Sequence, residues 1–226
     1  MRRREFLRGA AAAMPLAALA AEQPANALPP SFDLPRPQLQ GGRPLMQALS
    51  DRKTNRDISD EKLSPQMLSN LLWAAWGVNR TATRGRTAPS AMNVQELNLY
   101  VFLAEGVYLF DALSHSLKPV LAGDHRARTG SQDGVGKAPV SLVFVADLDK
   151  YSGSRGGRGT DAERQVTWSY AHCGFIGQNI YLFAASEGFA SWFRAMVDAP
   201  ALAKLLNLRP AQRVLCSQGV GYPAKA

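Results

Sequence analysis

The sequence predicts an α+β domain with a mixed, mostly antiparallel sheet flanked by helices. Three patterns indicate this class: a β-hairpin, a wholly apolar run typical of a buried strand, and helical segments bounded by capping residues. The 226 residues are 46% hydrophobic and 19% charged, which excludes a disordered or collagen-like chain. The length suits one principal core.

The first helices are expected on either side of a basic segment. Residues 44–50 predict a short helix that leads into Arg52. A second helix begins at Ser64, a favourable N-cap, followed by Pro65 at the first helical position. Its apolar residues recur with the 3.6-residue period, and Gly77 provides its C-terminal cap.

The strands are expected in the second half of the chain. Residues 97–103 and 107–110 predict a hairpin, because both are rich in β-forming residues and a glycine-containing turn joins them. Residues 140–146 form an uninterrupted apolar run, as in a buried central strand. A last strand is expected at 213–220.

Two further helices lie between the last two strands. The longer runs from about Asp161 to Glu187 and ends at Gly188. The shorter covers about residues 199–206. The glycine-rich stretch at 152–159 predicts a mobile loop rather than a phosphate-binding loop, since it does not join a strand to a helix.

Residues 1–27 are predicted to be an export signal. A basic start precedes an apolar run of 13 residues, Gly9–Ala21, which is shorter than the roughly 20 residues of a membrane span. Arg3-Arg4-Glu5-Phe6-Leu7 resembles the twin-arginine signal, whose export machinery carries folded proteins. An ordinary secretory signal with surplus arginine is the alternative. Either way the mature protein is expected in the periplasm.

The rest of the chain divides into an arm and a functional domain. Residues 28–43 are rich in proline and predict an extended arm on the surface or on a partner. Residues 44–226 form the functional domain. The net charge is +8, but the first 20 residues contribute +3 of it. The remaining excess is modest and scattered, which does not favour nucleic-acid binding.

The cysteines and histidines do not indicate a metal site. The three histidines lack metal-ligand spacing, and so do Cys173 and Cys216, so no metal is expected. Cys173 falls in a helical pattern and Cys216 in a strand pattern. Two buried thiols and a disulfide both remain open, since an exported chain meets an oxidising compartment.

Two short segments are candidates for binding a ligand. The first, residues 52–56 (Arg-Lys-Thr-Asn-Arg), puts three cations and a hydroxyl within five residues, a donor set suited to a phosphate. Solvated surface is the alternative. The second, residues 89–95 (Pro-Ser-Ala-Met-Asn-Val-Gln), combines small residues with amides that can bind the edge of a planar ring. A turn that caps the next strand is the alternative.

Together these segments resemble the FMN-dependent nitroreductase family. The family patterns are Arg-x-Ser/Thr-x-Arg, a helix like residues 63–77, and Pro-Ser-x-x-Asn-x-Gln before a strand. Residues 177–189 are similar to the family's long helix, and residues 219–223 to its terminal strand. The resemblance covers residues 49–223. It implies an FMN cofactor bound at a homodimer interface.

The resemblance also implies roles for individual residues. Arg52 and Thr54 hold the FMN phosphate, Lys53 contributes mainly its backbone, and Arg56 faces the N1–C2=O edge of the flavin. The residues expected to contact the flavin bound mainly to the other subunit are Pro89, Ser90, Ala91 and Asn93. A loop containing Ser191, Trp192 and Phe193 lies on the N5 side, where Trp192 shapes the substrate face or simply packs. Lys225 alone remains where family members carry a basic pair.

The implied activity is that of an oxidoreductase. Hydride passes between the flavin N5 and a small organic substrate, such as a nitroaromatic or a quinone, by a ping-pong mechanism. No catalytic side chain is assigned. Residues 106–126 look like the azoline-oxidising branch, but its Lys-Tyr pair is not found near residues 168–170. The alternatives are an exported dehydrogenase acting on a small molecule or peptide heterocycle, and a non-catalytic flavin-binding protein.

Overall fold

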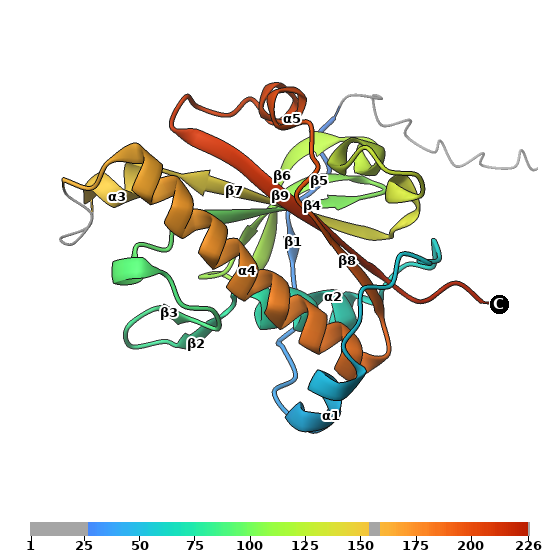
Figure 1. The fold of residues 1–226 in the computed structure, drawn as a ribbon. Helices are drawn as coiled ribbons and strands as arrows, with labels where there is room; N and C mark the ends of the chain where they lie inside the picture. The colour runs from blue at the N-terminus through green and yellow to red at the C-terminus, as the bar shows by residue number, and fades with distance from the viewer. Residues whose placement is uncertain (1–26, 154–158, 226) are drawn as a thin grey trace, which may run out of the picture.

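A computed structural model describes residues 27–153 and 159–225 of the chain. Residues 1–26 of the predicted export signal and residues 154–158 of the predicted 152–159 loop lie outside these residues. Within them, Figure 1 shows a curved sheet crossed on one face by a long helix, α4. The elements in chain order are β1 (Phe32–Asp33), α1 (Leu45–Asp51), α2 (Pro65–Trp76), β2 (Val78–Arg80), β3 (Gly85–Arg86), the 3₁₀ turn η1 (Ala91–Asn93), β4 (Leu97–Leu103), β5 (Gly106–Asp111), β6 (Ser116–Ala122), η2 (Arg126–Thr129), η3 (Val135–Lys137), β7 (Val140–Asp147), α3 (Asp149–Gly153), α4 (Ala162–Glu187), β8 (Ala190–Arg194), α5 (Ala199–Leu205) and β9 (Gln212–Gly221).

The main sheet has the strand order β1-β6-β5-β4-β7-β9-β8. Every pairing in it is antiparallel among the described residues. The predicted α+β class and mostly antiparallel sheet are therefore confirmed. The predicted apolar strand, β7, is buried along its whole length between β4 and β9.

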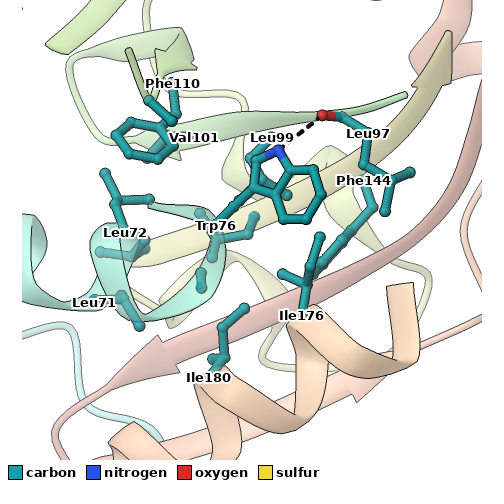
Figure 2. Close-up of a cluster of buried hydrophobic side chains, with 14 of the residues drawn as sticks. Leu71, Leu72, Trp76, Leu97, Leu99, Val101, Phe110, Phe144, Ile176 and Ile180 are labelled. Atoms are coloured by element: carbon teal, nitrogen blue, oxygen red, sulfur yellow. Dashed lines mark hydrogen bonds between the residues drawn. The ribbon is translucent and has the colours of Figure 1, made fainter. Parts of the chain in front are cut away.

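Side chains that alternate along the strands cover both faces of the sheet. Leu99 and Val101 of β4 point toward α2 and α4, whereas Tyr100 and Phe102 point toward α5. Figure 2 shows the first of these cores, where Trp76 of α2 lies among side chains of the sheet and α4. Its indole N–H donates to the Leu97 carbonyl at 3.1 Å, so a buried polar atom is satisfied.

The predicted helix ends agree closely with the structure. The Ser64 hydroxyl accepts a hydrogen bond from the Met67 N–H at 3.2 Å at the start of α2. The Asp161 carboxylate does the same for Arg164 at the start of α4. Gly188 ends α4 in the left-handed conformation, with φ 77°. These local signals work because each satisfies backbone groups that the helix leaves unpaired.

Strand β6 was not anticipated. Lys118 and Pro119 interrupt its apolar pattern, and the pairing of β5 with β6 has an irregular register at Tyr108. The strand forms because β5 on one side and β1 on the other supply its partners. The pairing with β5 is a local hairpin and the pairing with β1 is long-range, and residue propensities contain neither.

The proline-rich arm lies on its own chain. Phe32–Asp33 pairs with β6, and the arm then follows α2. There the Ser69 hydroxyl donates to the Pro35 carbonyl at 2.5 Å, and the Gln38 N–H donates to the Asn70 side chain at 2.9 Å. The arm is thus anchored by the polar residues of a helix that otherwise faces the core.

The two cysteines are free thiols and both are buried. Cys173 lies on α4 and Cys216 on β9, within the same core. Burial raises the pKa of the Cys173 thiol well above its ordinary value, and the neighbouring Cys216 raises it further. The structure therefore places two unbridged thiols side by side in the core. None of the described helices is both long and apolar enough to cross a membrane.

The end of α4 offers a stability test. Replacing Gly188 with Ala is expected to lower the free energy of unfolding by about 1 kcal/mol, because a Cβ disfavours its positive φ. A Cβ at this position meets no atom within 4 Å, so the cost is one of backbone conformation. Gly188→Asn should cost less, since asparagine tolerates this conformation. Equal urea midpoints for all three proteins would contradict this assignment.

Candidate functional site

The basic segment 52–56 follows α1 and lies against β8. The Asn55 N–H donates to the Ser191 carbonyl at 3.0 Å, which ties the segment to that strand. Among the described residues, Arg52, Lys53 and Arg56 form no ion pair. The segment thus presents three cations whose charge no carboxylate neutralises.

The acidic residue beside this segment is already engaged. Asp51 accepts hydrogen bonds from Gln47 at 2.9 Å and from Arg43 at 2.6 Å. These bonds, first from Gln47 and then from Arg43, hold the pKa of Asp51 below its ordinary value. The carboxylate therefore stays ionised and paired with Arg43, and leaves the 52–56 cations available to an external anion.

Tyr181 of α4 organises the segment and was not predicted. Its hydroxyl lies 2.9 Å from the Thr54 hydroxyl and accepts the Phe193 N–H at 2.9 Å. The Arg52 guanidinium lies over its ring, 5.6 Å from the centroid. Tyr181 can donate its own proton to Thr54, which then has its hydroxyl proton free for a phosphate oxygen.

A pocket of about 550 Å³ opens beside these residues, with Lys53, Asn55 and Tyr181 in its wall. The C-terminal tail borders the same region. Pro223 pairs with Ile58, and the Ala224 N–H donates to the Asp57 carbonyl at 2.8 Å. Lys225 is exposed and follows directly. The structure therefore brings Lys225 to the side of the chain that carries the 52–56 segment.

The expected loop at Ser191, Trp192 and Phe193 is wrong: these residues form part of strand β8. They pair with Val220, Gly219 and Gln218 of β9. Because side chains alternate along a strand, Phe193 faces α4 at Gly177, whereas Trp192 points to the opposite face. The predicted contact with the flavin N5 would have to come from an edge strand.

Trp192 lies between two guanidinium groups. Arg56 is 5.3 Å and Arg194 is 4.8 Å from its ring centroid. Only 5% of Trp192 is exposed, which favours packing over the substrate-shaping role. Arg194 is also buried, and desolvation lowers its pKa to about 10, so it remains charged at neutral pH. Trp192 therefore contacts both the buried Arg194 and the exposed Arg56 through its ring.

The 89–95 loop has a strained backbone. Met92, Asn93 and Gln95 have φ values of 52°, 54° and 53°, although none is glycine. Side chains inside the loop hold this shape: the Ser90 hydroxyl accepts the Gln95 N–H at 3.0 Å, and the Gln95 amide donates to Asn93 at 2.9 Å. Strain of this kind persists where the surroundings impose it, and it concentrates at functional sites.

The 89–95 loop and the 52–56 segment form two separate clusters. The Ala91 N–H donates to His172 of α4 at 2.8 Å, whereas Thr54 contacts Tyr181. His172 and Tyr181 are nine residues apart on one helix, about 13 Å along its axis. One chain therefore does not bring Pro89, Ser90, Ala91 and Asn93 to the phosphate-binding candidates.

The described residues hold no group of three or more His, Cys, Asp or Glu side chains able to bind a metal ion.

A second cavity, of about 370 Å³, lies between the arm, the start of α2 and the β4–β5 hairpin. It contains none of the predicted site residues. Both candidate segments instead contact α4, at Tyr181 and at His172.

Comparisons with known proteins agree with this arrangement. The family model described as "Nitroreductase family" matches residues 49–222. The protein named "Putative nitroreductase MJ1384" of Methanocaldococcus jannaschii is 31% identical over 160 residues, which span 65% of this chain and 76% of that protein. A crystal structure from Ralstonia eutropha, described as a "putative nitroreductase", is 36% identical, with a TM-score of 0.80 over 87% of this chain and 90% of that one.

A more distant structure shares the fold alone. It is the NADPH:FMN oxidoreductase of Vibrio harveyi in complex with NAD⁺, 16% identical, with a TM-score of 0.59 over 80% of this chain and 69% of that one. Members of the matched family typically use a flavin. The match over residues 49–222, together with the two closer similarities, shows that the chain belongs to the nitroreductase family and is an oxidoreductase.

Proposed function

We propose that the protein is an FMN-dependent oxidoreductase that exchanges hydride between the flavin and a small organic substrate. The observation that supports this most is the 52–56 segment: its three cations have no carboxylate partner among the described residues, and Arg52 and the Thr54 hydroxyl both lie against Tyr181. A phosphate dianion matches this donor set, because guanidinium forks and hydroxyls bind its oxygens directly. Family membership supplies the flavin to which that phosphate belongs.

The residues of the chain then have distinct tasks. Arg52 and Thr54 bind the phosphate, with Lys53 contributing its backbone and Lys225 closing from the C-terminal tail. Arg56, held over Trp192, faces the N1–C2=O edge, where its charge stabilises negative charge. Ser191 and Phe193 lie on the edge strand at the N5 side; because the Ser191 carbonyl binds the Asn55 N–H and the Phe193 N–H binds the Tyr181 hydroxyl, a contact with N5 would use their other backbone groups. When bound, FMN supplies the hydride chemistry at N5.

We propose a homodimer that completes this site. Helix α4 carries an outer face formed by Thr167, Tyr170, Ala171, Gly174, Phe175 and Gln178, all exposed in the single chain. Residues 165–186 contain no Asp, Glu, Lys or Arg, which is unusual for a helix that faces water. A second copy that covers this face would bring its Pro89, Ser90, Ala91 and Asn93 toward the first copy's 52–56 segment.

The rate at which a substrate reoxidises the reduced flavin distinguishes an enzyme from a non-catalytic flavin-binding protein. The single Lys225, where relatives carry a basic pair, motivates that second candidate. We expect chemically reduced, FMN-loaded protein to be reoxidised by a quinone or a nitroaromatic much faster than free reduced FMN at equal concentration. Reoxidation no faster than that of free FMN would favour the non-catalytic binder.

We also propose that the protein is exported by the twin-arginine machinery and works in the periplasm. An exported enzyme does not meet NAD(P)H, so its electrons come from an organic substrate or a redox partner. The Arg3→Lys/Arg4→Lys variant is expected to accumulate unprocessed in the cytoplasm, because that machinery requires the arginine pair. Cell fractionation measures this, with Arg8→Lys as the control. Normal export of the double variant would refute this route.

A further inference from the structure

His172 and Glu96 form a buried pair that joins both ends of the strained loop to α4. His172 Nδ1 lies 2.6 Å from Glu96 Oε1, and the two side chains are 4% and 0% exposed. His172 Nε2 accepts the Ala91 N–H at 2.8 Å. One imidazole therefore bridges residue 91 and residue 96, and the left-handed residues Met92, Asn93 and Gln95 all lie between them.

The hydrogen bonds fix the state of the imidazole. Because the Ala91 N–H donates to Nε2, this nitrogen carries no proton. The ring proton therefore sits on Nδ1 and is donated to the Glu96 carboxylate. A carboxylate that orients a histidine in this way also makes the opposite nitrogen a better acceptor.

The surroundings keep this pair dry. Tyr151 is fully buried beside the hydroxyl of Ser169, 3.3 Å away. Its burial, with a smaller contribution from the nearby Glu96, raises its pKa to about 12, so the phenol stays protonated. In such an environment a hydrogen bond between the loop and α4 is hard for water to replace.

We propose that His172 and Glu96 are positioning residues that hold the 89–95 loop in the strained shape that contacts the flavin. This inference takes the bound flavin from the proposed function and rests on it. Glu96 orients His172, His172 holds the Ala91 amide, and the loop then presents its small residues and the Asn93 amide outward. Both side chains are buried in the single chain, so in this proposal they act through the loop and not by touching the flavin.

Two substitutions of His172 separate the two bonds. His172→Gln places an amide oxygen near the position of Nε2, so it keeps an acceptor for the Ala91 N–H but loses the donor to Glu96. His172→Asn places an amide nitrogen near Nδ1, so it keeps the donor to Glu96 but loses the acceptor. Loss of the imidazole donor to the buried Glu96 carboxylate should cost more stability than loss of the acceptor for one backbone N–H, so the Gln variant should be the less stable one.

The affinity for FMN should rank the two variants in the opposite order to their stability. We expect His172→Asn to bind FMN about tenfold more weakly than His172→Gln, the equivalent of one lost hydrogen bond. Its bound flavin should also show an altered visible circular dichroism. Amide hydrogen exchange of residues 89–95, measured without flavin, should be about tenfold faster in the Asn variant. If His172→Gln does not fold, His172→Gln/Glu96→Gln removes the buried charge and takes its place.

The outcomes separate this inference from the proposed function. Equal FMN affinity and equal loop exchange in the two variants would refute the positioning role, whatever their stabilities. Affinity that falls in the order of stability would refute it as well. A wild-type chain that binds no FMN would refute the proposed function and the flavin role of the loop together, while unequal exchange would still support the His172–Glu96 anchor.

Discussion

Replacing Phe175 with Asp is expected to yield a monomer that no longer retains FMN. Phe175 is 46% exposed near the middle of the α4 outer face, next to Gly174. In a symmetric dimer each copy would bury a new carboxylate without a cation, and an uncompensated buried charge costs several kcal/mol. The monomer would lack the partner's 89–95 loop, so the Kd for FMN should rise more than about 100-fold.

Size-exclusion chromatography with light scattering, followed by FMN titration, measures both effects. Leu113→Asp is the matched control, because Leu113 is 59% exposed at the turn between β5 and β6 and lies outside the α4 face. It should leave the dimer and the affinity unchanged. A Phe175→Asp protein that remains dimeric and binds FMN normally would place the subunit interface elsewhere.

Replacing Arg52 with Met is expected to weaken FMN binding by about 10- to 100-fold, the loss of one charge-assisted hydrogen bond. Binding of riboflavin, which lacks the phosphate, should hardly change. This selectivity arises because Arg52 has no carboxylate partner among the described residues and is held over Tyr181 beside Thr54. Met retains the packing of the aliphatic part of the side chain on that ring.

Isothermal titration with FMN and with riboflavin tests this prediction. Lys204→Met, on α5 at the opposite face of the sheet, removes the same net charge away from the site and serves as the control. Equal loss of affinity for both ligands would show that Arg52 acts on the ring or on the fold instead of the phosphate.

The sequence predicted the elements whose signals are local. Ser64 and Gly188 mark helix ends because each satisfies backbone groups within one turn. The apolar run at 140–146 marks β7 because a strand buried on both faces has few polar residues. By contrast, β8 depends on β9, which is distant in the chain, and β6 follows β5 in a hairpin that its interrupted apolar pattern does not reveal. Trp192 and Phe193 are β-forming residues, yet the pairing of residues 191–193 with β9 decides the outcome.

Part of the candidate site was likewise recognisable from local sequence, and part of it was not. The 52–56 segment is recognisable because three cations and a hydroxyl occur together in sequence. Tyr181 and His172 are not, since an aromatic residue or a histidine in an apolar helix resembles ordinary core. Their roles depend on what reaches them: the Thr54 hydroxyl in one case, and the Ala91 N–H and Glu96 in the other.

The visible absorption spectrum of the purified mature protein tests the central claim most directly. After gel filtration, and after denaturation to release any ligand, we expect the two visible bands of oxidised flavin and one FMN per chain by chromatography of the released compound. If none is retained as purified, titration with FMN should quench its fluorescence to saturation at one per chain, while riboflavin binds much more weakly. A colourless protein whose titration with FMN shows no saturation would contradict the account.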